Sequence, residues 1–313
     1  MGLVVVLSGA LLACPWRSQA EPTYPGLPEP AFQPGGFIAV SQVGLSETAK
    51  ARQWVSVPAL TATAWSGTVN SILDPEPGVR VRQGAIGDAF FVSPPGAPAP
   101  YGYLPPLRVR TVGFGLLPVE AIVQVSQRRA DGVPIPIRGQ VTEDTLYGEG
   151  GKNMRDPHVD DAFEVRVIRV LVDGVDVGLT GQCRTVQPAP VHLTAPSYHI
   201  PFEALNDVRA YLATLDPTSY WHSRFGGQLS GTLDLPPFTG CTTKNGDDLS
   251  AMMTLSVSGP GNRVVFRTNA CGREETDELG RSIPVPTGQY TPDLYPPGCP
   301  APDALPYPDR PGD

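Results

Sequence analysis

The sequence predicts an all-β protein of antiparallel β-sandwich modules, with one short inserted helix and a disordered, proline-rich tail. Two observations lead to this fold class. The chain of 313 residues contains 37 prolines and 34 glycines but only 17% charged residues, a composition typical of many short strands joined by turns. In addition, apolar and polar residues alternate in many short runs, which is the period of a half-buried strand.

The clearest alternation lies between Gly226 and Cys271. Its first run ends at Pro236-Pro237, because proline donates no hydrogen bond to a neighbouring strand. The Asn245-Gly246 pair is a strong turn signal. We expect an antiparallel meander here, with strands at Gln228–Leu235, Met253–Ser258 and Arg263–Thr268 and turns at Lys244–Asp248 and Gly259–Asn262.

The same alternation predicts strands along the rest of the chain, and Asp173-Gly174 predicts a hairpin turn. Only Pro201–Leu215 has apolar residues at helical spacing, so it is the one predicted helix. The other predicted strands are Trp54–Val69, Val79–Gln83, Ala89–Val92, Leu107–Gly113, Glu120–Ser126, Val133–Val141, Phe163–Val172, Val175–Thr180 and Val191–Thr194.

The polar, glycine-rich stretch Leu146–Asp161 predicts a boundary between two β-sandwich modules, at 37–150 and 160–272. One large sandwich is the alternative. After Gly272 the chain is rich in proline and has no periodicity, so residues 273–313 are expected to be a disordered, acidic tail.

The N-terminal residues predict export. Leu3–Ala13 is an apolar run of signal-peptide length, and Ser18-Gln19-Ala20 resembles a cleavage site, so residues 1–20 are interpreted as a signal peptide. The alternative is a lipid anchor at Cys14, because Leu11–Cys14 resembles the box before a lipidated bacterial cysteine. Residues 21–36 are expected to form an extended, proline-rich linker. No later apolar run is long enough for a transmembrane span, which leaves a secreted or cell-envelope protein or an anchored lipoprotein.

Export favours disulfide bonds. Cys241 and Cys271 stand at the ends of the first and third runs of the meander and are predicted to pair, the alternative being two free buried cysteines. By elimination, Cys183 is assigned to Cys299 in the tail. Four cysteines allow three connectivities, so these pairings are hypotheses.

Motifs for common catalytic and cofactor chemistry are missing from the sequence. It contains no GxSxG, phosphate-loop, HExxH, CxxC or GxGxxG pattern, and no cofactor is expected. The net charge of −8 and the lack of a basic patch exclude a nucleic-acid-binding protein.

Two clusters are weak candidates for sites. Three carboxylates and an imidazole within six residues could ligate calcium or a transition metal, although their spacing matches no known loop and favours a solvated acidic loop. An aromatic and polar cluster before Gly226 could line a groove for a carbohydrate or aryl ligand, although a tryptophan anchored on the sheet is the simpler interpretation. The residues are Asp156, His158, Asp160 and Asp161 in the first cluster, and Tyr220, Trp221, His222 and Arg224 in the second.

Three blocks of the sequence carry a resemblance to a known group. VDGVDVGLTGQCRT (Val172–Thr185), GGQLSGTLDLPPFTGC (Gly226–Cys241) and the following DDLSAMMTLSVSGPGN are similar to blocks of secreted actinobacterial proteins without assigned function. The similarity covers roughly Phe163–Cys271. It implies export and a β fold, and it carries no activity that could be transferred.

The sequence therefore favours an exported, non-enzymatic protein of the cell envelope or the exterior that binds a protein or a cell-wall component. The alternative is a secreted hydrolase or carbohydrate-active enzyme with its site near Tyr220–Arg224, for which no catalytic residue is identified.

Overall fold

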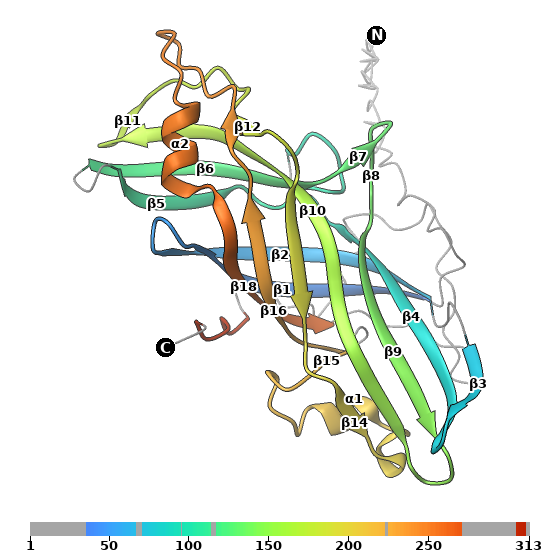
Figure 1. The fold of residues 1–313 in the computed structure, drawn as a ribbon. Coiled ribbons are helices and arrows are strands. Elements are labelled where there is room, and N and C mark those ends of the chain that lie inside the picture. The colour runs from blue at the N-terminus through green and yellow to red at the C-terminus, as the bar shows by residue number, and fades with distance from the viewer. Residues whose placement is uncertain are drawn as a thin grey trace, which may run out of the picture.

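The computed structural model describes residues 36–66, 71–94, 96–113, 117–222, 225–270 and 305–310. The described chain is mostly antiparallel β-sheet with little helix (Figure 1), which confirms the predicted all-β class. Up to residue 150 its strands are β1 (Gly36–Thr48), β2 (Gln53–Ser66), β3 (Ser71–Glu76), β4 (Val79–Phe91), β5 (Leu107–Gly113), β6 (Leu117–Gln127), β7 (Arg129–Ala130), β8 (Val133–Pro134) and β9 (Ile137–Leu146).

The second half is dominated by one long strand, β10 (Lys152–Val172), and by the pair β16 (Gly226–Leu235) and β18 (Gly259–Ala270). Among the described residues, no helix is both long and apolar enough to cross a membrane. The remaining elements are β11 (Val175–Asp176), β12 (Arg184–Thr185), β13 (Ala189–Thr194), β14 (Tyr198–Ile200), the 3-10 helix η1 (Phe202–Ala204), α1 (Val208–Leu212), β15 (Trp221–His222), β17 (Phe238–Thr239) and α2 (Ser250–Val257).

The main sheet closes on itself. Following hydrogen-bonded neighbours from β10, the order is β13, β16, β18, β1, β2, β4, β9 and back to β10. The closure is visible at Val159, which pairs with Gly139 of β9 on one edge of β10 and with Leu193 of β13 on the other. Because this ring leaves no free edge along its strands, its backbone groups are paired without an outside partner.

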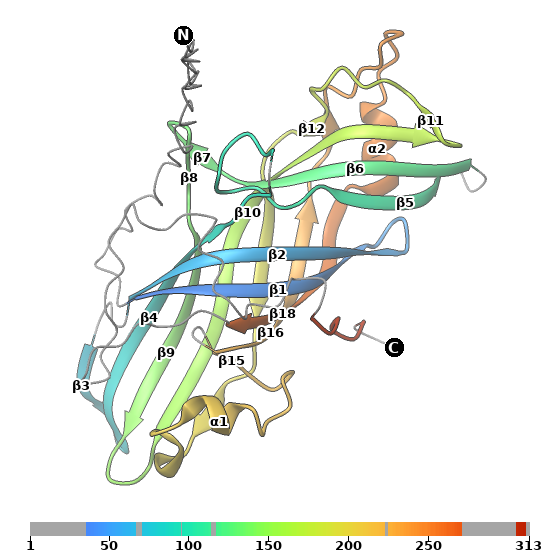
Figure 2. The same cartoon turned by 180° about the vertical axis from the view of Figure 1, so that it is seen from behind.

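The C-terminal half of β10 leaves the ring and builds a second layer. There β10 pairs with β6, which pairs with β5, while β12 joins β10 to β17. In both views, front and back, β5 and β6 lie beside β1 and β2 (Figures 1 and 2). In the described chain β5 contacts β2 but pairs only with β6. The molecule is therefore a closed ring with a sheet folded over one side of it.

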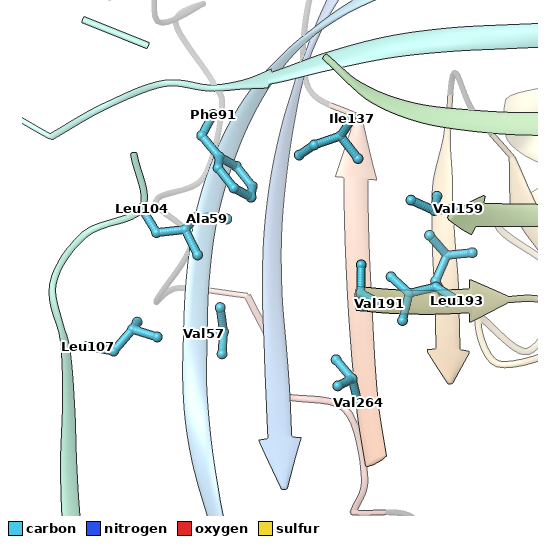
Figure 3. Packing of buried hydrophobic residues seen from close by; sticks show 11 residues of the cluster. Val57, Ala59, Phe91, Leu104, Leu107, Ile137, Val159, Val191, Leu193 and Val264 are labelled. Atoms are coloured by element: carbon cyan, nitrogen blue, oxygen red, sulfur yellow. The ribbon is translucent and has the colours of Figure 1, made fainter. Parts of the chain in front are cut away.

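Apolar side chains from both layers face the space between them. Figure 3 shows part of this cluster, with Val57 and Ala59 from β2 facing Leu104 and Leu107. At the far end of the ring, α1 and its flanking residues pack on Ala85 and other buried residues of β4, β9 and β10. The α1 segment therefore covers that end, while α2 packs on the second layer beside β17.

Most predicted strands are confirmed, and β5 has the predicted bounds. The predicted strands Val79–Gln83 and Ala89–Val92 belong to the single strand β4, and Phe163–Val172 is the second half of β10. The hairpin turn at Asp173-Gly174 is confirmed, since both residues have the positive φ that a type I′ turn requires. The tail prediction falls on residues 273–313, of which only 305–310 are described.

The predicted module boundary lies inside a strand. Leu146–Asp161 was expected to be a polar linker, but β10 runs through it with a register shift between Arg155 and His158. Strands of the two expected modules also pair directly, as β1 does with β18. The polar and proline residues form a bulge, which interrupts the ladder without ending the strand. Strands from both expected modules therefore belong to one continuous sheet.

The predicted strand Met253–Ser258 is wrong, because Ser250–Val257 is helix α2. Leu249, Met253 and Val257 pack on the apolar cluster around the cysteines at helical spacing, whereas Leu255 between them is 76% exposed. The predicted turn Gly259–Asn262 is the start of β18. In Pro201–Leu215 the structure has two short helical pieces, η1 and α1, in place of one helix.

The predicted cysteine pairs are also wrong. Cys183 forms a disulfide bond with Cys241, and both residues are fully buried. The bond joins the start of β12 to the segment that leads into α2, because β12 and β17 lie side by side through the pairing of Arg184 with Thr239. Cys14, Cys271 and Cys299 lie outside the described residues.

Candidate functional site

A large apolar cavity lies between the ring and the second layer. Its volume is about 750 Å³, within the range of cavities that hold small molecules. The inner faces of β2, β4, β5, β6, β10, β13, β16 and β18 line it, and α2 forms part of its wall. Protein interiors are normally packed as densely as organic crystals, so an unfilled space of this size is not ordinary packing.

The alternation of side chains between the two faces of each strand explains why the cavity lining is mostly apolar. In β5, Leu107, Val109 and Thr111 line the cavity, while Arg108 and Arg110 are exposed on the other face. Alternate residues of a strand point to opposite faces, so every strand contributes one row of side chains to the interior. The cavity is therefore built from the same alternation that predicts the strands.

Small side chains explain why the interior is not filled. Ala59, Ala89 and Ala121 all occupy cavity-lining positions where a larger residue would reach further inward. Ala89 and Ala121 are only partly buried although they lie on inner faces.

Charged residues line the cavity at one place, the turn between β1 and β2 and the strand ends beside it. There Ser46, Glu47, Lys50, Arg52 and Gln53 all border it. The Lys50 side chain reaches the start of β18, where a Cβ added to Gly259 would lie 3.6 Å from its Cε atom. We call this turn and the adjoining residues of α2, Met252 and Leu255, the mouth of the cavity.

The negative charge of the carboxylate at the mouth is compensated by an arginine. Glu47 accepts hydrogen bonds from Nε and Nη2 of Arg263 at 2.7 and 3.0 Å, and these bonds hold the pKa of Glu47 below its ordinary value. The Arg263 guanidinium also lies over the Trp54 ring, 5.3 Å from its centroid. Lys50 and Arg52, in contrast, form no ion pair with any residue that the structure describes.

The residues of the predicted groove are not gathered into one site. Tyr220 is buried against Tyr198, with ring centroids 5.7 Å apart, and burial raises the pKa of both phenols. Trp221 lines the cavity, with its ring over Gly139. The His222 ring contacts Phe225 at 4.6 Å between centroids, and Arg224 lies outside the described residues.

The four metal candidates are also separated. His158 is hydrogen-bonded through Nδ1 to the Asp156 carbonyl oxygen, Asp160 pairs with His192, and Asp161 accepts from Arg128 at 3.0 Å. Across the described ranges, no group of three or more His, Cys, Asp or Glu side chains is placed to hold a metal ion.

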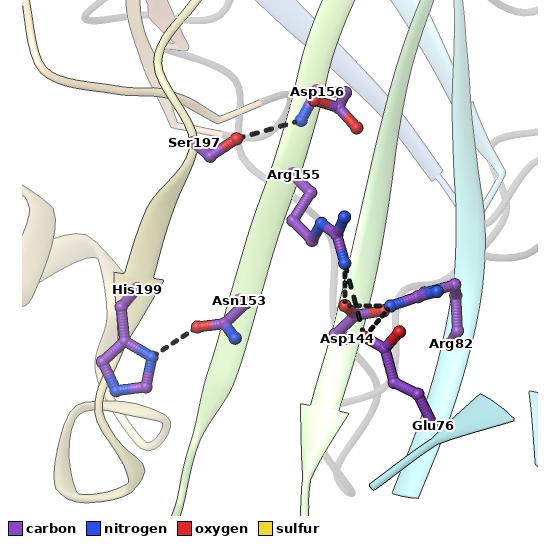
Figure 4. A network of polar contacts seen from close by, with 8 residues as sticks. All are labelled: Glu76, Arg82, Asp144, Asn153, Arg155, Asp156, Ser197 and His199. Atoms are coloured by element: carbon purple, nitrogen blue, oxygen red, sulfur yellow. Dashed lines mark hydrogen bonds and ion pairs between the residues drawn. The ribbon is translucent and has the colours of Figure 1, made fainter. Parts of the chain in front are cut away.

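The strongest polar cluster has a structural role. Figure 4 shows Arg82 and Arg155 around the buried carboxylate of Asp144, with Glu76 beside them. Hydrogen bonds from Arg82 hold the pKa of Asp144 below its ordinary value. The charges are compensated and connect β3, β4, β9 and β10, so the cluster stabilises the sheet.

The cavity is not predicted by the sequence patterns. Alternation shows which face of a strand is apolar, but it does not show whether the facing side chains meet. The only available signal was the small residues among the inward-facing positions, such as Ala59 and Ala121.

No protein-family model matches the sequence, and comparison with curated proteins and with solved structures also finds no match. The geometry of the cavity is therefore the basis for the proposed function.

Proposed function

We propose that this protein is an exported, non-enzymatic binding protein whose cavity holds an apolar ligand of acyl-chain type. The observation that carries the proposal is the cavity of about 750 Å³, lined mostly by aliphatic and aromatic side chains. Such a lining offers no hydrogen bonds along most of its length, so a sugar or peptide would lose its hydration there without compensation.

The energetics favour an acyl chain. Each methylene group moved from water into an apolar site contributes about 0.8 kcal/mol. A chain of roughly ten such groups therefore gains about 8 kcal/mol before the entropic cost of binding is subtracted. Micromolar affinity corresponds to about 8 kcal/mol net, so a longer chain of roughly sixteen methylene groups, with a gross gain of about 13 kcal/mol, reaches it after a cost of about 5 kcal/mol.

Export is supported by the signal-peptide pattern in residues 1–20 and by the disulfide bond between Cys183 and Cys241, because disulfides persist in oxidising compartments. The intact mass of the protein from its producing cells tests this part. A chain that begins at Glu21 supports secretion, whereas an acylated chain that begins at Cys14 supports a lipoprotein. An unprocessed chain retained in the cytoplasm contradicts export.

Ligand binding is tested by titrating the purified full chain with cis-parinaric acid, a fatty acid whose fluorescence rises in apolar surroundings. We expect saturable binding with a Kd in the micromolar range or below. The double variant Ala89→Phe/Ala121→Phe places two rings at cavity-lining positions and should weaken binding at least tenfold.

The matched control is Ala130→Phe, which adds a ring at an exposed position of β7 outside the cavity. It should bind the probe as the wild type does. Thermal unfolding should show that all three proteins are folded. If the wild type shows no saturable binding, or if filling the cavity leaves binding unchanged, the proposed function is wrong.

A further inference from the structure

We propose that the ligand is an anionic lipid, with its acyl chain in the cavity and its head group bound at the mouth by Lys50 and Arg52. This inference rests on the proposed function and specifies the chemical class of the ligand. It follows from the charges and polar atoms at the mouth, which the apolar interior does not explain.

The charges at the mouth are not balanced. Lys50 and Arg52 are both exposed, and neither is paired with a carboxylate in the described chain. Glu47, the acidic residue that lines the cavity beside them, is held by two hydrogen bonds from Arg263. The mouth therefore carries two uncompensated positive charges, although the whole chain has a net charge of −8.

The two positive charges lie next to apolar surface. Both cations lie in the turn that borders a mostly apolar cavity with no other cationic side chain in its lining, and Met252 and Leu255 of α2 belong to the same mouth. Next to apolar surface an ion pair is screened less than in bulk water, so an anion bound here would interact more strongly than at an open surface. An acyl chain with a terminal anionic group satisfies both parts of this site.

The mouth also contains a side-chain amide oxygen that has no hydrogen-bond partner among the described residues. The side-chain oxygen of Gln53 is buried and has no hydrogen-bond partner among the described residues, and Gln53 borders the cavity next to Arg52. A buried acceptor without a donor costs free energy. A hydroxyl group on the lipid head group would donate to this oxygen, which favours a head group that carries both a negative charge and hydroxyl groups.

The experiment compares two lipids that differ only in their head groups. Full-length protein is titrated with fluorescent phosphatidylglycerol, which is anionic and carries hydroxyl groups, and with fluorescent phosphatidylcholine of the same acyl chains. At low ionic strength we expect phosphatidylglycerol to bind at least tenfold more tightly, and this preference should shrink as salt is added.

The variant Lys50→Gln/Arg52→Gln should lose most of the preference, because its affinity for phosphatidylglycerol falls much more than its affinity for phosphatidylcholine. The control Arg80→Gln removes an exposed charge from β4 outside the cavity and should keep the preference. Gln53→Leu should reduce the affinity for phosphatidylglycerol more than that for phosphatidylcholine.

The outcomes separate the two proposals. If the wild type binds both lipids equally, the head-group assignment is wrong while the apolar binding function stands. If the preference survives in the Lys50→Gln/Arg52→Gln variant, these two residues are not the head-group site. If the wild type binds neither lipid and also fails to bind cis-parinaric acid, both proposals are wrong. The comparison of the two lipids on the wild type does not depend on the folding of any variant.

Discussion

Cys183 and Cys241 are joined by a disulfide bond that ties β12 to the segment leading into α2. The bond spans 58 positions of sequence, so it closes a long loop in the unfolded chain. Around it pack Val165, Val167 and Phe238, together with Leu249 and Met253 from the α2 segment. The wall of the cavity mouth is thus covalently anchored to the second layer.

Removing this bond should destabilise the protein. For a loop of this length the chain-entropy estimate gives about 4 kcal/mol. We expect the Cys183→Ser/Cys241→Ser variant to unfold at a clearly lower denaturant concentration than the oxidised wild type, and the reduced wild type to match the variant. Peptide mapping of unreduced protein should recover the Cys183 and Cys241 peptides linked. Equal unfolding midpoints for the oxidised and reduced wild type would contradict this prediction.

The Asp144 ion pairs should make stability depend on pH. The Asp144 side chain is 1% exposed and accepts from Arg82 at 2.6 and 2.8 Å, which lowers its pKa in the folded state. A carboxylate whose folded pKa lies below its unfolded value contributes stability above the unfolded value, near 3.9, and loses it as the pH falls through the folded pKa.

Replacing Asp144 with Asn should therefore lower the free energy of unfolding by about 2 kcal/mol at pH 7, since charged hydrogen bonds are lost. The difference from the wild type should shrink as the pH is lowered below 4. Asp131→Asn, in the exposed turn between β7 and β8, is the control and should change stability little at either pH. Urea titrations at several pH values measure the difference, and a gap that stays constant with pH would argue against this role of Asp144.

A buried amide connects the ring to the loops around the second layer. The Gln127 side chain accepts from the Phe91 amide at 2.8 Å and donates to the carbonyl oxygens of Ala89 and Ile135 at 3.2 and 2.7 Å. Gln127 is only 1% exposed. Gln127→Leu would remove all three hydrogen bonds, and each buried group that is left without a partner costs about 1–3 kcal/mol.

We expect Gln127→Leu to lower the free energy of unfolding by about 3 kcal/mol, allowing for partial relaxation. Gln187→Leu, at an exposed position between β12 and β13, is the matched control and should stay within about 0.5 kcal/mol of the wild type. Equal stability of both variants would show that water replaces the Gln127 contacts at little cost.

Local alternation was enough to predict most strands, because it depends only on one face of each strand being apolar. In β5 the row of Leu107, Val109 and Thr111 opposes exposed arginines, and the predicted bounds are those observed. Partner choice was not predictable in this way, since the pairing of β1 with β18 joins residues more than two hundred positions apart, such as Val40 and Ala270.

The bulge in β10 shows a second limit. Asp156 has a positive φ and Pro157 cannot donate a ladder hydrogen bond, so this stretch has the composition of a loop. Pro157 is nevertheless fully buried, and β10 continues on both sides of it. Burial of that one proline depends on the closed ring around it, which local sequence does not encode. The cavity was missed for a related reason, because it depends on the distance between two layers.

The α2 segment was predicted to be a strand, and the strand and the helix bury different side chains. Met253, Leu255 and Val257 alternate with polar residues as in a strand, and a strand would place all three on one face. In the helix, Met253 packs against the cluster around the disulfide, whereas Leu255 is 76% exposed at the cavity mouth. Met253→Ser should therefore lower the free energy of unfolding by about 2–3 kcal/mol, whereas Leu255→Ser should change it by less than about 0.5 kcal/mol.

Denaturant unfolding of the two variants, each compared with the wild type, measures this difference. Similar losses from both substitutions would support the alternating strand and contradict the helix. Because Leu255 also borders the cavity, Leu255→Ser combines near-wild-type stability with weaker binding of cis-parinaric acid if the mouth contacts the bound chain. That combination would connect the position of α2 to ligand binding without any effect on folding.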